Sequence, residues 1–285
     1  MKDTILYGDC RETLREFDSK ARMCVTSPPY YGLRNYGGEE DQIGLEQTPE
    51  EYVDNLVKVF REVRNCLTDD GTCWVNLGDS YYNYRPGKGQ AIHKQSVSKT
   101  NQDLPSTCAR RGNKLEGLKE KDLIGIPWMF AFAMRADGWY LRQDIIWNKP
   151  NPMPESVRDR CTKSHEYIFL FSKSQNYYFD VNAIKESTVD GKGLKRKKTV
   201  WEIKTKPYKG AHFAVYPPEL IEPCIKAGSE EGDLVLDPFM GSGTTALVAK
   251  SLQRHYLGCE LHEDYGKLIQ TRLSEKSFAR LNFND

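Results

Sequence analysis

Near the end of the chain, residues 234–245 read Leu234-Val235-Leu236-Asp237-Pro238-Phe239-Met240-Gly241-Ser242-Gly243-Thr244-Thr245. A short apolar strand is followed by a turn with two glycines and then by a helical pattern. Gly241 and Gly243 permit a tight turn and let a ligand approach the backbone, while the first amides of the helix offer unpaired donors. The stretch therefore predicts a strand, a ligand-binding turn and a helix of an α/β fold.

An acidic residue, Glu260, ends the next predicted strand, where its carboxylate can accept from both hydroxyls of a ribose. With Ala246, the two glycines satisfy the loose dinucleotide fingerprint, so the pattern indicates a nucleoside-containing cofactor without saying which one. A phosphate-binding P-loop is disfavoured because Thr244 and Thr245 stand where that motif places its lysine. A tight turn with no ligand stays open as the alternative.

Outward from this stretch, short apolar strands alternate with amphipathic helices, which is typical of a mostly parallel sheet covered on both faces. We expect strands at 5–7, 23–26, 73–77, 140–147, 167–171, 233–237 and 256–260. We expect helices at 11–17, 49–67, 123–136, 217–226, 244–253 and 264–273. The helix at 49–67 starts with a capping box of Thr48 and Glu51, and Asp69-Asp70-Gly71 is expected to turn the chain after it.

The composition fits a soluble, cytoplasmic protein. Of its 285 residues, 39% are hydrophobic and 28% are charged, and the longest apolar run, Trp128–Met134, is far short of a membrane span. Residues 1–10 lack the apolar core of a secretory signal. Eight cysteines stand singly, with no CxxC pair and no histidines gathered near them, so we expect reduced thiols and no metal site.

The charge is distributed unevenly. With 41 Lys+Arg against 40 Asp+Glu the net charge is +1, which by itself argues against a nucleic-acid partner. Residues 81–121 carry nine cations against three carboxylates, a local charge of +6. Residues 185–209 again sum to +6, leaving −11 on the rest of the chain. Solvated loops and two elements that track a nucleic-acid backbone are equally good explanations of these inserts.

A second stretch, Ser27-Pro28-Pro29-Tyr30, follows the strand predicted to end at Thr26. Two prolines stiffen the loop and remove two amide donors, so its carbonyls and the Ser27 hydroxyl become fixed acceptors. Such a loop suits an exocyclic amine on a base: Ser27 Oγ and the Pro28 carbonyl accept its two protons, and Tyr30 covers one face of the ring. A rigid surface turn with a packing tyrosine explains the stretch equally well.

At this point the chain resembles a known family. Residues 26–30 are similar to the catalytic motif of the amino-group DNA methyltransferases, and residues 237–245 are similar to their S-adenosylmethionine motif. Segments 8–10, 147–152, 164–166 and 212–217 are similar to further parts of phage and bacterial members. The catalytic motif precedes the cofactor motif, as in the β-type order of the family.

The resemblance implies an α/β fold: a circularly permuted, Rossmann-like, S-adenosylmethionine-dependent methyltransferase sheet with helices on both faces and basic inserts. The permutation is sterically acceptable if a strand at 5–7 lies beside the strand at 256–260. The catalytic part of the core would then comprise 1–80 and 122–172, and the cofactor-binding part 211–285. The 81–121 insert would face DNA, and 173–210 would recognise the target.

The resemblance also implies a role for each site residue. The catalytic set is Ser27, Pro28, Pro29 and Tyr30. The cofactor set is Asp9, His212, Phe213, Ala214, Asp237, Phe239, Gly241, Gly243, Thr244 and Glu260. Within the cofactor set, Glu260 holds the ribose, Asp9 accepts from the adenine amine, and Asp237 hydrogen-bonds the methionine amino group. His212, Phe213 and Ala214 help to enclose the methionine.

Family members with serine before Pro-Pro-Tyr mostly methylate N4 of cytosine, and those with Asp or Asn there mostly methylate N6 of adenine. We therefore expect methyl transfer to N4 of a cytosine flipped out of double-stranded DNA, with Trp147 as the second aromatic against the base. The residues expected to contact DNA are Arg34, Lys195, Arg196, Lys197 and Lys198. No covalent intermediate is needed, so the cysteines are expected to be dispensable.

Several alternatives stay open. The nearest is an N6-adenine DNA methyltransferase with the same fold, followed by a methyltransferase of RNA or of a protein glutamine. A nicotinamide-dependent dehydrogenase would leave Ser27–Tyr30 unused, and a non-catalytic DNA-binding protein would need neither motif. The resemblance further allows a homodimer and a companion restriction endonuclease, in a bacterial or phage-infected cell.

Overall fold

The computed structural model describes residues 1–32, 42–82, 115–205 and 216–273. Four of the expected site residues, Arg34, His212, Phe213 and Ala214, lie outside the described residues, as does most of the 81–121 insert. None of the helices in the described part combines the length and the apolar character that a bilayer crossing requires.

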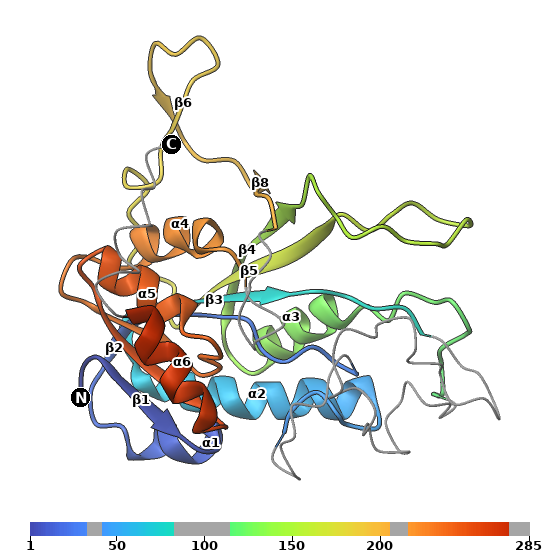
Figure 1. The fold of residues 1–285 in the computed structure, drawn as a ribbon, viewed down its shortest axis with the longest axis horizontal. Helices are drawn as coiled ribbons and strands as arrows, with labels where there is room; N and C mark the ends of the chain where they lie inside the picture. Colours follow the sequence, from blue (N-terminus) through green and yellow to red (C-terminus); the bar gives the residue numbers. More distant parts are fainter. Residues whose placement is uncertain (33–41, 83–114, 206–215, 274–285) are drawn as a thin grey trace.

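An eight-stranded sheet forms the middle layer of the molecule (Figure 1), in the order β1-β10-β9-β2-β3-β5-β4-β8. Its strands are β1 Thr4–Tyr7, β2 Ala21–Thr26, β3 Leu67–Leu77, β4 Tyr140–Asn148, β5 His165–Ser172, β8 Val200–Glu202, β9 Leu234–Asp237 and β10 His255–Glu260. Strand β5 runs antiparallel to β3 and β4, and the other strand pairs of this sheet are parallel. The mostly parallel sheet predicted from the sequence is thus confirmed.

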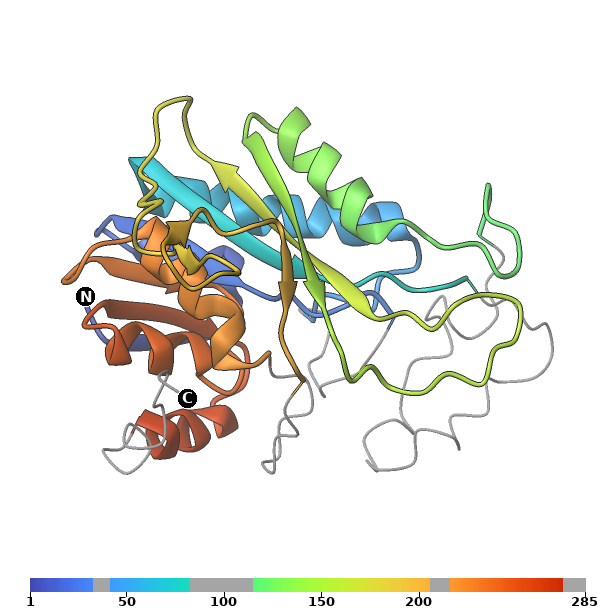
Figure 2. The ribbon, with the colours of Figure 1, turned by 90° about the horizontal axis from the view of Figure 1, so that it is seen from above.

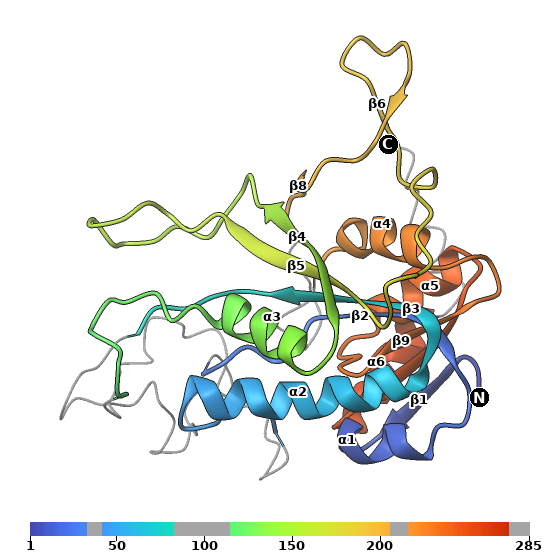
Figure 3. The same cartoon turned by 180° about the vertical axis from the view of Figure 1, so that it is seen from behind.

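Helices cover both faces of the sheet (Figures 2 and 3). On one face lie α1 Cys10–Thr13, the 3₁₀ turn η1 Leu14–Glu16, α2 Pro49–Cys66 and α3 Ile126–Ala136; on the other lie α4 Pro218–Gly228, α5 Thr244–Ser251 and α6 Asp264–Leu273. Successive strand residues point to opposite faces. In β9, for example, Leu234 and Leu236 join the core under α2, while Val235 joins the core under α4 and α5. The sequence therefore builds two separate apolar cores.

Two local predictions are confirmed in detail. Helix α2 begins at Pro49 with the complete capping box, in which Thr48 Oγ1 accepts from the Glu51 amide at 3.1 Å and the Glu51 carboxylate accepts from the Thr48 amide at 3.3 Å. Strand β1 pairs in parallel with β10, from Thr4 opposite Leu257 to Tyr7 opposite Glu260. The first strand of the chain therefore completes the sheet beside the last, as the permuted order requires.

The prediction of a turn at Asp69-Asp70-Gly71 is wrong. Strand β3 begins directly after α2 at Leu67 and runs through these residues to Leu77. Opposite them the pairing register with β2 shifts between Ala21 and Met23, so the additional residues are taken up as an irregularity of the strand. Tertiary contacts override the turn preference of the local sequence, since the Asp70 carbonyl accepts from the Tyr178 amide at 2.9 Å and the Gly71 carbonyl from the Lys173 amide at 3.0 Å.

Two further boundaries differ from expectation. Helix α3 starts at Ile126 rather than residue 123, because Gly125 has a φ of +87° and the Asp79 carboxylate accepts from the Gly125 and Ile126 amides, at 3.0 and 3.1 Å. The sequence analysis also missed three short strands after residue 185: β6 Glu186–Ser187 and β7 Leu194–Lys195, which form a small hairpin, and β8 at the sheet edge.

We predict that Gly71→Ala lowers the free energy of unfolding by about 1–3 kcal/mol, because an added methyl group is forced against immobile backbone. A Cβ at this position would lie 2.9 Å from the Thr68 carbonyl oxygen and 3.1 Å from the Arg22 carbonyl oxygen. Urea titration measures the change. The control is Gly193→Ala, where the nearest atom would be 3.9 Å away. Equal stability of the two variants would contradict the packing argument.

Candidate active site

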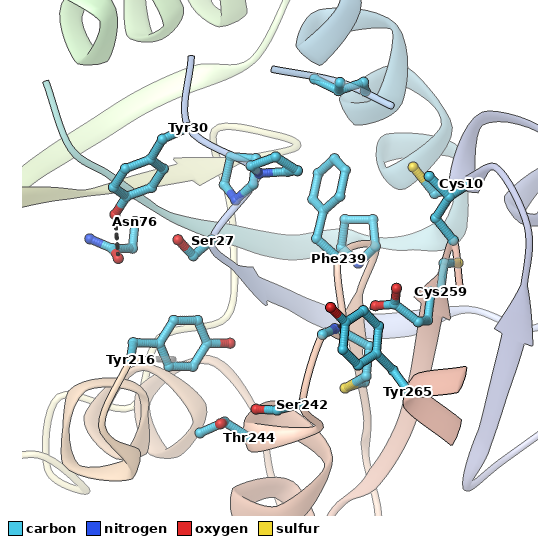
Figure 4. A pocket seen from close by; sticks show the side chains of 18 of the residues that line it. Cys10, Ser27, Tyr30, Asn76, Tyr216, Phe239, Ser242, Thr244, Cys259 and Tyr265 are labelled. Atoms are coloured by element: carbon cyan, nitrogen blue, oxygen red, sulfur yellow. Dashed lines mark hydrogen bonds between the residues drawn. The ribbon is translucent and has the colours of Figure 1, made fainter. Parts of the chain in front are cut away.

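A cavity of about 510 Å³ opens where β1, β10, β9 and β2 end (Figure 4). Since the carboxyl ends of neighbouring parallel strands meet at one edge of a sheet, the loops that follow them lie side by side. Of the expected site residues, the cavity lining contains Asp9, Ser27, Pro28, Pro29, Tyr30, Trp147, Phe239, Gly241, Thr244 and Glu260. The glycine turn and the Pro-Pro-Tyr loop thus face one common space.

The glycine turn has the backbone conformation that its sequence predicts. Gly241 and Gly243 have φ values of +53° and +80°, in the left-handed region that favours glycine. A Cβ on Gly243 would also lie 2.9 Å from the Ile269 side chain of α6. Gly243 is the N-cap of α5 and lies behind the cavity lining, whereas Gly241 is part of it.

Glu260 lies at the end of β10 with 8% of its surface exposed. Its carboxylate accepts from the Gly241 amide at 2.8 Å and from the His262 amide at 3.1 Å. Burial raises the pKa of Glu260 to about 7, although these two amides oppose the rise. The carboxylate therefore changes charge near neutral pH while it faces the cavity.

Asp237 lies at the end of β9, 1% exposed and outside the cavity lining. Its carboxylate accepts from four donors: Thr26 Oγ1 at 2.5 Å, the Phe239 amide at 3.0 Å, Thr245 Oγ1 at 2.5 Å and Tyr216 OH at 3.3 Å. Burial raises the pKa of Asp237, and hydrogen bonds from Thr245 and Thr26 counteract the rise. These contacts join β2, the glycine turn and α5 at one carboxylate.

The Pro-Pro-Tyr loop is anchored at two adjacent residues, Pro29 and Tyr30. The Pro29 carbonyl accepts from Tyr52 OH of α2 at 2.7 Å. The Tyr30 hydroxyl donates to Glu166 Oε2 at 2.6 Å, and burial together with the negative charge of Glu166 raises the pKa of Tyr30. Gly78 leaves room for the ring, since a Cβ there would lie 2.8 Å from Tyr30 Cε2. In Figure 4 the ring stands beside Ser27 at one end of the cavity.

The sequence analysis assigned no role to several polar residues of the lining, among them Asn76 of β3, Lys149 just after β4 and Glu166 of β5. Lys149 and Glu166 fall in segments where the family resemblance was noted, but no role was assigned to them. Their signal in the sequence is polarity at the ends of strongly apolar strands. That signal becomes specific only when the strands pair and bring the side chains together.

The end of the cavity around β1 and β10 has the features that a nucleoside-containing cofactor needs. Gly241 of the glycine turn lines the cavity, and Asp9 and Glu260 place carboxylates in the lining. His262 also lines the cavity, and its buried Nε2 has no hydrogen-bond partner among the described residues. Figure 4 shows Phe239 between this end, near Cys10 and Cys259, and the end that holds Ser27 and Tyr30.

Of the basic residues expected to contact DNA, the structure describes Lys195, Arg196, Lys197 and Lys198. They lie away from the cavity lining, in and after the β6–β7 hairpin that projects from the body (Figure 1). Lys195 and Lys197 have their ammonium groups 3.7 and 3.8 Å from the Glu186 carboxylate. Lys197 also lies over the Trp201 ring, 5.2 Å from its centroid. Arg196 and Lys198 are exposed.

Comparison with known proteins identifies the family. The DNA methylase family of N6 and N4 methyltransferases matches residues 21–271, and the chain belongs to it. The chain is 50% identical over 271 residues to the type II methyltransferase M.XycI of Xanthomonas campestris pv. cyanopsidis, covering 95% of this chain and 87% of that one. It is also 50% identical over 271 residues to M.SmaI of Serratia marcescens, covering 94% and 90%.

Solved structures share the fold. The PvuII DNA methyltransferase (cytosine-N4-specific) superposes with a TM-score of 0.68 at 21% identity, covering 98% of this chain and 90% of that one. A Thermus thermophilus protein solved in complex with S-adenosyl-L-methionine has a TM-score of 0.63 at 23% identity, covering 96% and 93%. The protein is a DNA methyltransferase with a Rossmann-like fold, and its cofactor is S-adenosylmethionine.

We predict that cofactor affinity depends on pH through Glu260. Its pKa is about 7, so the carboxylate, which the sequence analysis expects to hold the ribose hydroxyls, is about tenfold less populated at pH 6 than at pH 8. Isothermal titration should therefore show about tenfold weaker binding of S-adenosylmethionine at pH 6. Glu260→Gln should bind S-adenosylmethionine more weakly and lose this pH dependence. Because ionisation of the cofactor itself affects both proteins equally, the difference between them isolates the contribution of Glu260. The same pH profile in both proteins would contradict the assignment.

Proposed function

We propose that the protein transfers a methyl group to the exocyclic N4 amine of a cytosine flipped out of double-stranded DNA. The observation that carries the proposal is the common cavity: Ser27 and Tyr30 line it together with Phe239 and Gly241 of the cofactor turn. Serine before Pro-Pro-Tyr favours cytosine over adenine, and a structural neighbour is named as cytosine-N4-specific. The N6 amine of adenine is the second candidate.

Each residue of the loop has a role in this reaction. The Ser27 hydroxyl and the Pro28 carbonyl accept the two protons of the amine and so orient the nitrogen lone pair. Tyr30 offers an aromatic face to a base whose extrusion costs a few kcal/mol of stacking, whereas the Trp147 ring lines the cavity beneath the Lys149 ammonium group. S-adenosylmethionine, when bound, supplies the electrophilic methyl group. Most of the rate then comes from holding the amine in place for attack.

The cysteines are poorly suited to be nucleophiles. Burial raises the pKa of Cys10, Cys24, Cys224 and Cys259 and keeps these thiols protonated. Direct attack by the base amine needs no covalent enzyme intermediate. The proposal therefore assigns no chemical step to a thiol.

Analysis of methylated DNA tests the choice of base. Mass spectrometry of nucleosides from DNA treated with enzyme and S-adenosylmethionine should show N4-methylcytosine. N6-methyladenine in its place would overturn the cytosine assignment and leave the methyltransferase intact.

We predict that Ser27→Ala slows single-turnover methyl transfer about a hundredfold or more, because one of two acceptors for the amine is removed. Cofactor affinity should stay within about threefold of wild type, since Ser27 touches the base and not the cofactor. Rapid-quench kinetics and isothermal titration measure the two quantities. A loss of cofactor affinity as large as that of Gly241→Asp would contradict the assignment of Ser27 to the base.

Neutralising Lys195, Arg196, Lys197 and Lys198 together should weaken DNA binding and reduce the slope of log affinity against log salt by about 2–4. The smaller value applies if Lys195 and Lys197 stay with Glu186 when DNA binds. Fluorescence anisotropy across a salt series measures the slope, with cofactor affinity as the control. An unchanged slope would mean that this run is a solvated surface and not a DNA contact.

The type II class of the relatives favours a companion restriction endonuclease that acts on the same DNA sequence. A homodimer is a further proposal that rests on the family resemblance alone.

A further inference from the structure

The proposed function leaves a question about base recognition. Cytosine and adenine both present an amine with a ring nitrogen acceptor beside it, N3 in cytosine and N1 in adenine. The next group along this edge differs, because cytosine has the O2 acceptor where adenine has a C2–H. A site that orients the amine with Ser27 can therefore distinguish the two bases by a donor to O2.

Lys149 provides such a donor. Among the described residues that line the cavity it is the only lysine or arginine, and 18% of its side chain is exposed. Its ammonium group lies over the Trp147 ring, 4.3 Å from the centroid. The cation therefore covers this face of the indole, and a base on this side of the cavity meets the ammonium group.

Glu166 holds this ammonium group in place. Glu166 Oε1 accepts from Lys149 Nζ, while Oε2 accepts from Tyr30 OH at 2.6 Å and from Asn76 Nδ2 at 3.2 Å. The side chain of Glu166 is 15% exposed. One partly buried carboxylate thus fixes both the Tyr30 ring and the Lys149 cation, so their relative positions are set before a base enters.

The strands make this arrangement rigid. Trp147 of β4 pairs with Glu166 of β5, and Asn148 pairs with His165. Just beyond the strand, the Lys149 amide donates to the Ser164 carbonyl at 2.7 Å. The Trp147 indole is anchored separately, since its Nε1 donates to the Ile203 carbonyl at 2.8 Å. Side chains on paired strands hold their geometry better than side chains on loops.

The described contacts of Lys149 use one of its three ammonium protons, the one on Glu166. We propose that a second proton is donated to O2 of the flipped cytosine, which makes Lys149 a base-specificity residue of the enzyme. The proposal rests on the N4-cytosine function above. Adenine in the same position would leave a desolvated cation facing a C–H group, a mismatch that such sites reject strongly.

The test pairs a change in the enzyme with a change in the base. Single-turnover methylation is measured on duplexes with cytosine or 2-thiocytosine at the target, because sulfur is a much weaker acceptor than oxygen. Wild type should prefer cytosine by about tenfold or more. Lys149→Met should be slower on cytosine and should lose most of that preference. The larger size of sulfur affects wild type and Lys149→Met alike. The change in the ratio of the two rates between these enzymes therefore isolates the hydrogen bond from Lys149 to O2.

The matched control is Lys226→Met, which removes another lysine paired with a glutamate, Glu222, outside the cavity. It should keep the wild-type rate and preference. If Lys149→Met does not fold, Glu166→Gln is measured in its place, because it removes the charge that holds Lys149. The proposal then predicts a reduced preference of Glu166→Gln for cytosine over 2-thiocytosine. A wild-type ratio of the cytosine rate to the 2-thiocytosine rate in Lys149→Met overturns the proposal. If Lys149→Met does not fold, the same ratio in Glu166→Gln overturns it.

Failure of this inference can be separated from failure of the proposed function. The methylated base is identified by nucleoside mass spectrometry in the wild-type reaction. N6-methyladenine there would overturn both proposals. N4-methylcytosine together with an unchanged oxygen-to-sulfur preference in Lys149→Met would overturn only the role of Lys149.

Discussion

The active site depends on the hydrogen bonds that the buried carboxylate of Asp237 accepts. Burying a carboxylate costs free energy of folding unless donors surround it. Here four donors converge on it, one each from β2, the glycine turn and α5, and the hydroxyl of Tyr216. Thr26, one of these donors, directly precedes Ser27. The start of the Pro-Pro-Tyr loop, the proposed catalytic loop, and the start of the cofactor turn are therefore held by the same group.

A second carboxylate does comparable work at the other end of the cavity. Glu166 holds Tyr30, Asn76 and Lys149, and so ties the far end of the catalytic loop to β3 and β4. The loop between the two carboxylates contains two prolines and has its Pro29 carbonyl bound by Tyr52. The acceptors proposed for the amine are thus fixed from both sides before substrate binds, which is how a methyltransferase without a covalent intermediate gains rate.

The sequence predicted the features that are local. Hydrophobic periodicity predicted the layered sheet, Thr48 and Glu51 predicted the start of α2, and the two motifs predicted which loops meet. It could not predict β3 correctly, because Asp69-Asp70-Gly71 favours a turn locally, and the backbone hydrogen bonds that the Asp70 and Gly71 carbonyls accept come from Tyr178 and Lys173, distant in the chain. Nor could it predict the Lys149–Glu166 pair or the hydrogen bond from Thr26 to Asp237, since these contacts arise from the pairing of separate strands. The near-zero net charge also concealed the two basic inserts, of which only part belongs to the described residues.

The central claim is that the Asp237 carboxylate aligns the catalytic loop with the cofactor turn, and Thr26→Val tests it most directly. This isosteric change removes one donor from Asp237 and leaves the reacting groups in place. Single-turnover methyl transfer at saturating cofactor and DNA should fall about tenfold or more, while cofactor affinity stays within about threefold of wild type. Thr4→Val, in β1 and outside the cavity lining, is the control. A wild-type transfer rate in correctly folded Thr26→Val would contradict the claim.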